Sequence, residues 1–358
     1  MDTQNTTNSK QNSGYKSESL FRKRIRRFKK FKRGYYSFWL IVIMYILSFM
    51  APLLMNYKAL VVKYDGKYYF PVFKYYQGKV FNQDVYGEGD FRELQKRFKE
   101  ERGGNWVLMP PYPFGPYESL TDPTKEPPNP PSKGHWFGTD DRGRDVFVRL
   151  AYGFNISISF ALVLLIVCYS IGIMIGATLG YYGGWWDILG QRVIEIWTSM
   201  PFLFIVIIIS SILQPNFMLL VFIMAFFGWT PMTYYLRSET YREKAKEYVQ
   251  AAIAMGASDR TVMFKHILPN ALTPVISFAP FTIIAYIGSL VSLDYLGFGL
   301  PPPTPSWGEL VSQGMGNIFS WWLVLYPLGA LFFTLLMVVF IGEAVRNAFD
   351  PREYSRLR

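Results

Sequence analysis

The residue types that carry out catalysis or bind metals are few and scattered in this sequence of 358 residues. Its one cysteine, Cys168, excludes an intrachain disulfide, and its two histidines, His135 and His266, are too far apart for metal-ligand spacing. The sequence contains no G-x-x-x-x-G-K-[ST] phosphate loop and no Ser/His/Asp set. Only paired acids such as Glu100-Glu101 would support a membrane-bound enzyme. We therefore expect no catalysis, metal or cofactor in this chain.

Docking to another protein is the chemistry that residues 247–270 indicate. Val249, Ala252, Ile253 and Gly256 follow the spacing i, i+3, i+4 and i+7, so they share one face of a helix. A face of small and apolar groups suits insertion into a partner's groove. It suits packing against the chain's own membrane helices equally well, and the spacing does not distinguish the two.

A helix, a glycine turn and a second helix must present that face. Residues 238–255 are rich in Ala, Glu, Lys and Arg, which favour a helix, and Gly256 is placed to end it. Ser258 or Asp259 can cap a second short helix, which must end before Pro269.

Long uncharged stretches show what this loop connects. Residues 34–57, 150–186, 196–236, 267–293 and 310–342 contain no Asp, Glu, Lys or Arg. A helix that crosses a bilayer needs about 20 largely apolar residues. We predict an all-α membrane protein with six transmembrane helices, at roughly 36–55, 156–181, 188–213, 217–236, 274–293 and 320–342, so that 156–342 forms the main membrane domain.

The basic residues predict the orientation. Eleven Lys/Arg precede the first span, which we interpret as a retained anchor whose basic tail contacts lipid headgroups, not nucleic acid. The tail 1–35, the loop 237–273 and the tail 343–358 are all basic and are expected in the cytoplasm. The segment 56–155 then lies outside the plasma membrane.

The external segment is expected to be irregular or a small α/β unit between the first and second spans. Alternating residues at Tyr68–Phe73 suggest short strands, and Asp90–Glu101 a helix. The proline-rich stretch Pro110–Pro131 predicts little regular structure. No task can be assigned to this segment from its sequence.

Charged residues occur near the ends of the spans. Arg192 and Glu195 are i, i+3 neighbours that can pair, and with Asp187 they lie close to the cytoplasmic interface, which favours a structural role. Asp294 stands at the outer end of the fifth span, where it either meets the amino terminus of a peptide or bonds within its own loop.

Three further patterns carry two interpretations each. Gly172, Gly176 and Gly180 indicate close helix packing, with pore lining as the alternative. Trp185-Trp186 and Trp321-Trp322 are typical of membrane interfaces, with ligand stacking as the alternative. The cluster Asp140–Asp145 with Arg142 and Arg144 predicts a salt-bridged turn, with contact to a binding protein as the alternative.

The cytoplasmic loop resembles the EAA loop of binding-protein-dependent ABC importer permeases. Their pattern is Glu-Ala-Ala, three residues, Gly, nine residues, then Ile-x-Leu-Pro. Gln250-Ala251-Ala252, Gly256 and His266-Ile267-Leu268-Pro269 occupy that spacing here. Gln250 replaces the family's Glu, and His266 replaces its Ile.

Further motifs extend the resemblance over residues 138–351, more loosely to the first helix and only weakly to 56–137. They are similar to the second-type permease subunit of the dipeptide, oligopeptide and nickel branch, and most similar to microcin C-type peptide importer permeases. The matching motifs are Gly138–Val146, Leu293–Gly299, Pro302–Gly308 and Ile341–Pro351.

The resemblance implies the ABC importer permease fold and one half of a translocation pore for peptides or modified peptides. It implies a second homologous permease, two ATP-binding subunits that bind the ATP and Mg, and an external solute-binding protein. The implied ATPase-coupling residues are Val249, Gln250, Ala251, Ala252, Ile253, Gly256, His266, Leu268 and Pro269.

The cargo stays open at this point. Nickel or another small solute is the alternative to peptides, and Asp294, Gly172 and Gly176 are the candidates for a substrate path. A secondary transporter would need charged residues along its spans, and the span centres carry almost none.

Overall fold

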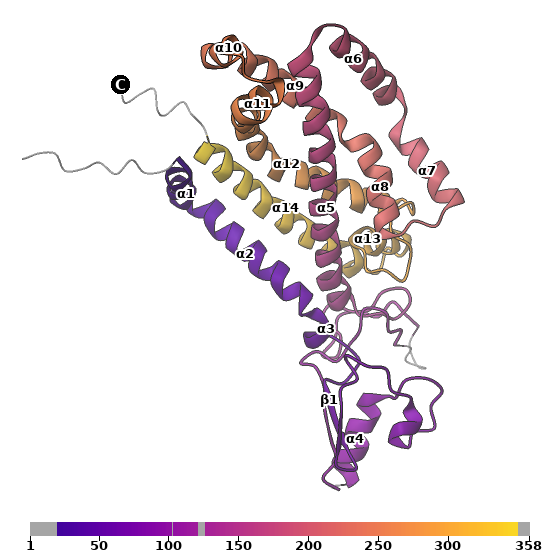
Figure 1. The fold of residues 1–358 in the computed structure, drawn as a ribbon. Coiled ribbons are helices and arrows are strands. Elements are labelled where there is room, and N and C mark those ends of the chain that lie inside the picture. Colours follow the sequence, from indigo (N-terminus) through magenta and orange to yellow (C-terminus); the bar gives the residue numbers. More distant parts are fainter. Residues whose placement is uncertain (1–19, 102, 121–125, 350–358) are drawn as a thin grey trace, which may run out of the picture.

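The computed structural model describes residues 20–101, 103–120 and 126–349. The expected tails 1–35 and 343–358 and the proline-rich stretch 110–131 lie partly outside these residues. The described chain is mostly helical, with a small sheet at one end (Figure 1). In chain order the elements are α1 (Leu20–Lys30), α2 (Lys32–Phe49), α3 (Ala51–Leu54), β1 (Val61–Tyr64), β2 (Lys67–Tyr69), a 3-10 helix (Gly78–Phe81), α4 (Phe91–Glu101), β3 (Trp106–Leu108), α5 (Val146–Tyr182), α6 (Gly184–Ser199), α7 (Phe202–Ile212), α8 (Phe217–Gly228), α9 (Thr230–Lys244), α10 (Glu247–Ala254), α11 (Asp259–Thr261), a π-helical turn (Val262–Ile267), α12 (Leu268–Tyr295), α13 (Trp307–Gly316) and α14 (Trp322–Phe349).

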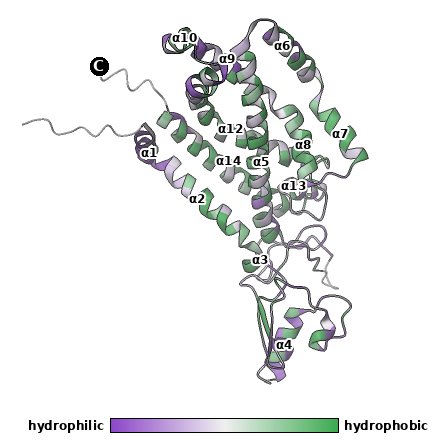
Figure 2. Ribbon diagram, viewed as in Figure 1, coloured by the Kyte–Doolittle hydropathy of each residue, from purple (hydrophilic) through white to green (hydrophobic). Residues whose placement is uncertain are grey.

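The chain is a multi-pass membrane protein. Within the described ranges, three helices are long and apolar enough to cross a membrane, namely α5, α14 and the continuous helix Asp259–Tyr295 that ends as α12. There are up to five if each bent pair, α6 with α7 and α8 with α9, is one span. Hydrophobic residues dominate α7 and α8, whereas α1 is hydrophilic (Figure 2). The span expected at 36–55 corresponds to α2 and α3, which are separated at Met50, and a total of six spans stays a prediction.

Two of the expected spans are bent, which corrects their description as single helices. The span expected at 188–213 consists of α6 and α7, which meet at 65° around Met200-Pro201. The span expected at 217–236 consists of α8 and α9, which meet at 42° beside Pro231. Proline lacks an N–H to donate and disfavours helical backbone in the residue before it. Met200 accordingly has an extended backbone, with ψ 128°.

The second helix of the loop 237–273 does not end before Pro269, and that prediction was wrong. α11 runs through the π-helical turn directly into α12, so the span expected at 274–293 begins at Leu268. Pro269 follows the π-helical turn Val262–Ile267, where the regular α-helical hydrogen-bond pattern is already interrupted, and the helix continues past it although proline has no N–H to donate. The helix expected at 238–255 is also interrupted, at Ala245-Lys246.

α5 begins ten residues earlier than the helix expected at 156–181 because Asp145 caps it. The Asp145 carboxylate accepts a hydrogen bond from the Val148 N–H at 2.9 Å. Such a cap satisfies a backbone donor that the first turn of a helix leaves unpaired. α14 likewise continues beyond 320–342, to Phe349.

Glycines bring α5 into backbone contact with α9. A Cβ atom on Gly176 would lie 2.6 Å from the Thr233 carbonyl oxygen. Cβ atoms on Gly172 and Gly180 would meet carbonyl oxygens of α9 at 2.8 and 2.7 Å. Only glycine permits so close an approach, which is the packing interpretation of these positions and leaves Gly172 and Gly176 facing α9.

Trp322 corrects the interfacial interpretation for one of the four tryptophans. It is buried, and its indole N–H donates to the Thr139 carbonyl at 3.1 Å. A buried indole needs such a partner for its N–H. Trp185, Trp186 and Trp321 are exposed.

The external segment contains a three-stranded antiparallel sheet in the order β2-β1-β3. One face of this sheet packs on α4 and the 3-10 helix through Phe81, Phe91, Leu94 and Phe98. The strand suggested at Tyr68–Phe73 ends at Tyr69, and the helix expected at Asp90–Glu101 is α4. We call residues 56–109, which are expected outside the membrane, the external domain and residues 110–120 the strap that leads from it toward α5.

The contact between α5 and α9 predicts a difference between two otherwise similar glycines. Gly176→Ala should destabilise the chain by about 1–3 kcal/mol, because the added methyl collides with the α9 backbone. Gly288→Ala in α12 is the matched control, because no atom lies within 4 Å of its added Cβ. Thermal unfolding of the purified chain in detergent measures both. Equal melting temperatures for the two variants would contradict the packing described here.

Candidate functional site

The loop between α9 and α12 forms the end of the molecule opposite the sheet (Figure 1). α10 ends at Ala254, and Gly256 has φ +83°, a left-handed backbone that glycine adopts without strain. The Gly256 N–H donates to the Ile253 carbonyl at 2.9 Å, and the Ala257 N–H to the Ala252 carbonyl at 3.1 Å. Together these bonds form a Schellman turn. The predicted helix stop at Gly256 is confirmed.

Half of the expected docking face points inward. Val249 and Ala252 are both buried. Val249 belongs to a cluster with Ala177 of α5, Met232 of α9 and Ala271 of α12. The packing explanation of their spacing therefore holds for these two residues. A partner can reach only the other side of the turn.

The loop also carries exposed apolar residues, on α10, on the turn after it and on the π-helical turn. Met255 is 82% exposed, Phe264 is 63% exposed and Ile253 is 38% exposed. Ala251 is also exposed, and no atom lies within 4 Å of a Cβ built on Gly256. Sequence reasoning missed Met255 and Phe264, because the loop contains other large apolar residues such as Val249, Val262 and Met263, and only the fold shows which of them are exposed. We define the loop tip as the five exposed residues Ala251, Ile253, Met255, Gly256 and Phe264.

The departure from the family pattern at Gln250 has a structural explanation. Gln250 is exposed, and its side-chain amide donates to the Lys244 carbonyl at 2.7 Å. That carbonyl ends α9 and lacks a partner within the helix. An ionised glutamate side chain has no N–H and could not donate this hydrogen bond. Gln250 therefore fixes the angle between α9 and α10.

The remaining expected coupling residues, His266, Leu268 and Pro269, lie where the loop continues into α12. His266 is half-buried, and its carbonyl accepts from the Asn270 amide at 3.0 Å. Leu268 packs against the buried cluster, whereas Pro269 is exposed. None of these three belongs to the loop tip.

Hydrogen bonds attach the loop to the end of α5. The Tyr181 hydroxyl donates to the Asp259 carboxylate at 2.7 Å, and the Lys244 ammonium donates to the Tyr181 carbonyl at 2.5 Å. Tyr248 donates to the buried Glu243 at 2.9 Å. Burial, followed by the contact with Glu243, raises the pKa of Tyr248. These contacts hold the loop as one unit with α5 and α9.

Two ion pairs lie near this end of the described chain. The predicted pair of Arg192 and Glu195 is confirmed at 2.6 Å and is exposed. Asp187 pairs instead with Arg237 of α9, and it accepts a hydrogen bond from Tyr241 at 2.9 Å. Sequence spacing could not reveal this pair, because its members are 50 residues apart.

Asp294, at the far end of α12, uses both carboxylate oxygens within its own loop. One accepts from the Leu300 N–H at 2.7 Å, and the other accepts from the Ser306 hydroxyl at 2.5 Å. The side chain is buried. The arrangement corresponds to the loop-bond interpretation and leaves Asp294 unavailable to a peptide in this conformation.

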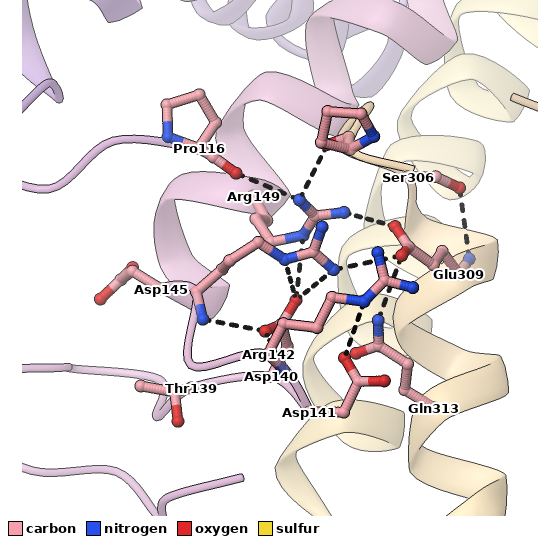
Figure 3. Close-up of polar contacts among 12 residues, drawn as sticks. Pro116, Thr139, Asp140, Asp141, Arg142, Asp145, Arg149, Ser306, Glu309 and Gln313 are labelled. Carbon is pink, nitrogen blue, oxygen red and sulfur yellow. Dashed lines mark hydrogen bonds and ion pairs between the residues drawn. The ribbon is translucent and has the colours of Figure 1, made fainter. Parts of the chain in front are cut away.

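The acidic and basic cluster at the start of α5 is a turn locked by buried charges (Figure 3). Asp140 accepts from the backbone N–H groups of Arg142 and Arg144 at 3.0 and 2.9 Å. The Arg144 side chain also donates to Asp140, at 2.6 Å. The predicted salt-bridged turn is thus observed. It also includes Arg149 of α5 and Glu309 of α13, which sequence reasoning missed because Glu309 lies 160 residues from Arg149.

The Schellman turn predicts a graded response to substitution of Gly256. Gly256→Ala places a side chain at φ +83° and should destabilise the turn by about 1 kcal/mol. Gly256→Asn should cost less, because asparagine tolerates left-handed backbone. The rate of hydrogen exchange at the backbone amides of residues 256 and 257 measures both effects, and it should be slowest in the wild type and fastest in Gly256→Ala. Identical exchange in the two variants would show that backbone strain does not control this turn.

Comparisons with known proteins agree with the resemblance that the loop and flanking motifs indicate. The family model described as binding-protein-dependent transport system inner membrane component matches residues 172–353. The chain is 42% identical to the inner membrane ABC transporter permease protein YejE of Escherichia coli strain K12, over 91% of this chain and 96% of that protein. It is 38% identical to the peptidoglycan transport system permease protein YejE of Agrobacterium fabrum, over 94% of each. It is 33% identical to the oligopeptide transport system permease protein OppC of Bacillus subtilis, over 67% of this chain and 79% of that protein. The chain therefore belongs to the family of binding-protein-dependent transport system inner membrane components.

Proposed function

We propose that this chain is a permease subunit of an ATP-driven importer for peptides or modified peptides, and that it forms half of the translocation pore. Its relatives are named as permeases for peptidoglycan, oligopeptides, dipeptides and glutathione, which are peptides or contain them. The second half of the pore comes from a homologous permease. Two ATP-binding subunits bind ATP and Mg, and an external solute-binding protein delivers the cargo.

The loop tip is the observation that carries this proposal. A preformed turn exposes Met255 and Phe264 at the end of a membrane protein that has no phosphate loop of its own. Large apolar side chains beside an exposed glycine suit a partner's groove, and their burial there is favourable. An ATP-binding subunit is the partner that an importer needs at this place. The remaining expected coupling residues act by holding the tip in position.

Movement of the tip would be passed to several spans together. The buried cluster below it joins Ala177 of α5, Met232 of α9 and Ala271 of α12. Close-packed side chains transmit displacement with little compression. Closure of the ATP-binding subunits would therefore tilt these helices as a unit, in the rocking motion by which alternating access is achieved.

The proposed orientation places the loop tip and both termini in the cytoplasm. α1 and the loop 237–273 are basic, as cytoplasmic segments are. The external domain, at the other end of the molecule, then lies outside the plasma membrane (Figure 1).

Reconstitution tests the function directly. Proteoliposomes that contain this chain, the second permease and the ATP-binding subunits should import a labelled tetrapeptide when the binding protein and ATP are supplied. Uptake should cease when ATP is replaced by a non-hydrolysable analogue. Import of nickel but not peptide would refute the peptide cargo. Uptake driven by a proton gradient without ATP would refute the ATP-driven mechanism.

The loop tip makes a prediction that compares two exposed phenylalanines. Phe264→Ser should weaken co-purification of the ATP-binding subunits and reduce uptake about tenfold or more, because it removes an anchor whose burial contributes roughly 1.5–3 kcal/mol. Phe319→Ser is the matched control, since Phe319 is 88% exposed and lies in the segment between α13 and α14, away from the loop. Quantified subunit ratios after pull-down measure the effect. Equal losses in both variants would argue against docking at the tip.

A further inference from the structure

Arg149 joins three separate segments at the outer ends of the spans. Its guanidinium donates to the Pro116 carbonyl of the strap at 3.1 Å. It also donates to the Pro303 and Thr304 carbonyls, both at 3.2 Å, in the loop between α12 and α13. Its ion pair with Glu309 adds α13 (Figure 3). Arg149 is fully buried, so these contacts account for the orientation of its guanidinium.

The strap connects this arginine to the external domain. Arg92 of α4 forms an ion pair with Glu118, two residues beyond the Pro116 carbonyl that Arg149 holds. The Leu120 N–H donates to the Gly143 carbonyl at 3.0 Å. The strap is therefore held at both of its sides, by the domain and by the start of α5.

A second polar contact fixes the beginning of the strap. The Tyr112 hydroxyl donates to Asp145, the cap of α5, at 2.7 Å, and the His135 ring lies 2.7 Å from the same carboxylate oxygen. Burial, followed by the hydrogen bond to Asp145, raises the pKa of Tyr112 well above its usual range. Tyr112 therefore stays a neutral donor at any physiological pH, and this attachment does not depend on titration of the phenol.

On the other side, Glu309 connects Arg149 to α12. α13 packs against α12 so closely that a Cβ on Gly308 would lie 2.2 Å from the Val291 carbonyl oxygen. Asp294 of α12 holds the intervening loop through Ser306, the residue that caps α13. A displacement of the strap therefore reaches α12 through two short routes, by way of α13 and by way of the loop.

The chemistry of Arg149 suits this junction better than lysine would. A guanidinium presents five N–H donors in a fixed plane, so it can bond several acceptors from different directions at once. Here it bonds three carbonyl oxygens and a carboxylate. A lysine would keep the positive charge but would lack the donors and the geometry to reach all four acceptors.

We propose that Arg149 and Glu309 are positioning residues that couple the external domain to the outer ends of α12 and α13, so that the state of the external side controls stimulated ATP hydrolysis at the other end of the chain. This inference rests on the proposed function, because it needs an ATP-binding subunit and an external binding protein. Coupling energies between such sites correspond to affinity or population changes of roughly 5–150-fold.

The test uses the complete transporter in nanodiscs and compares ATP hydrolysis with and without the binding protein loaded with a tetrapeptide. Arg149→Lys and Glu309→Gln should retain basal hydrolysis but lose stimulation by about fivefold or more. The binding-protein concentration for half-maximal stimulation should not change, because docking is intact and only transmission is lost. A merely structural role would lower basal and stimulated hydrolysis in parallel.

Two further variants test the route on the domain side. Arg92→Gln breaks the link between α4 and the strap and should reproduce the loss of stimulation, even if Arg149→Lys fails to assemble. Arg97→Gln is the matched control on the same helix, because Arg97 bonds the Phe81 and Asn82 carbonyls and pairs with Glu101, all of which lie within the external domain and not in the strap. It should be stimulated normally.

The outcomes separate the inference from the function beneath it. Normal stimulation in an assembled Arg92→Gln or Arg149→Lys transporter would overturn the coupling route while the proposed function stands. An equal loss in Arg97→Gln would also overturn it, by showing a general effect on the domain. Absence of stimulation and of ATP-driven uptake in the wild type would instead refute the proposed function itself.

Discussion

The backbone contact between α5 and α9 is the constraint on which the other features depend. The glycines of α5 let the two helices approach until carbonyl oxygens and Cα atoms touch, and this is the most extensive helix pairing among the described residues. α9 leads into the loop before α12, and α5 ends beside that loop with Tyr181 bonded to Asp259. The other end of α5 carries Arg149. The same helix thus contacts the loop before α12 at one end and contributes Arg149 to the ion cluster at the opposite end.

The charged interactions lie toward the two ends of the membrane helices. Charged residues in a hydrocarbon layer are costly, and they are accepted where they are paired or near an interface. The pair of Asp187 and Arg237 lies toward the loop, and the cluster around Arg149 lies toward the external domain. Between them the helices pack through apolar side chains such as Phe160, Leu164 and Leu290. Specific contacts at two ends and uniform packing between them suit a protein that must move without unfolding.

Local chemistry was predictable from the sequence, whereas partners distant in the chain were not. Gly256 ended its helix as expected, because a glycine in a left-handed turn leaves a recognisable local pattern. Pro269 was misjudged because the π-helical turn before it interrupts the regular hydrogen bonds and the helix continues through the proline, as it does through Pro274 and Pro280. Pro201 was overlooked within an apolar run that looked continuous. Arg149 and Glu309 gave no signal, since each looks like an isolated charge until the fold brings them together. The inward turn of Val249 and Ala252 likewise needed the neighbouring helices to be known.

The length of α5 has a consequence for how the molecule sits in lipid. Its 37 residues extend for about 55 Å, against about 30 Å of hydrocarbon in a typical bilayer. Hydrophobic matching therefore cannot define the depth of this helix, because a shift of several ångströms leaves the hydrocarbon layer filled by helix. Its depth is set by the anchors at its two ends. Bilayers of different thickness can accordingly accommodate the same arrangement, with the lipid adapting to the protein.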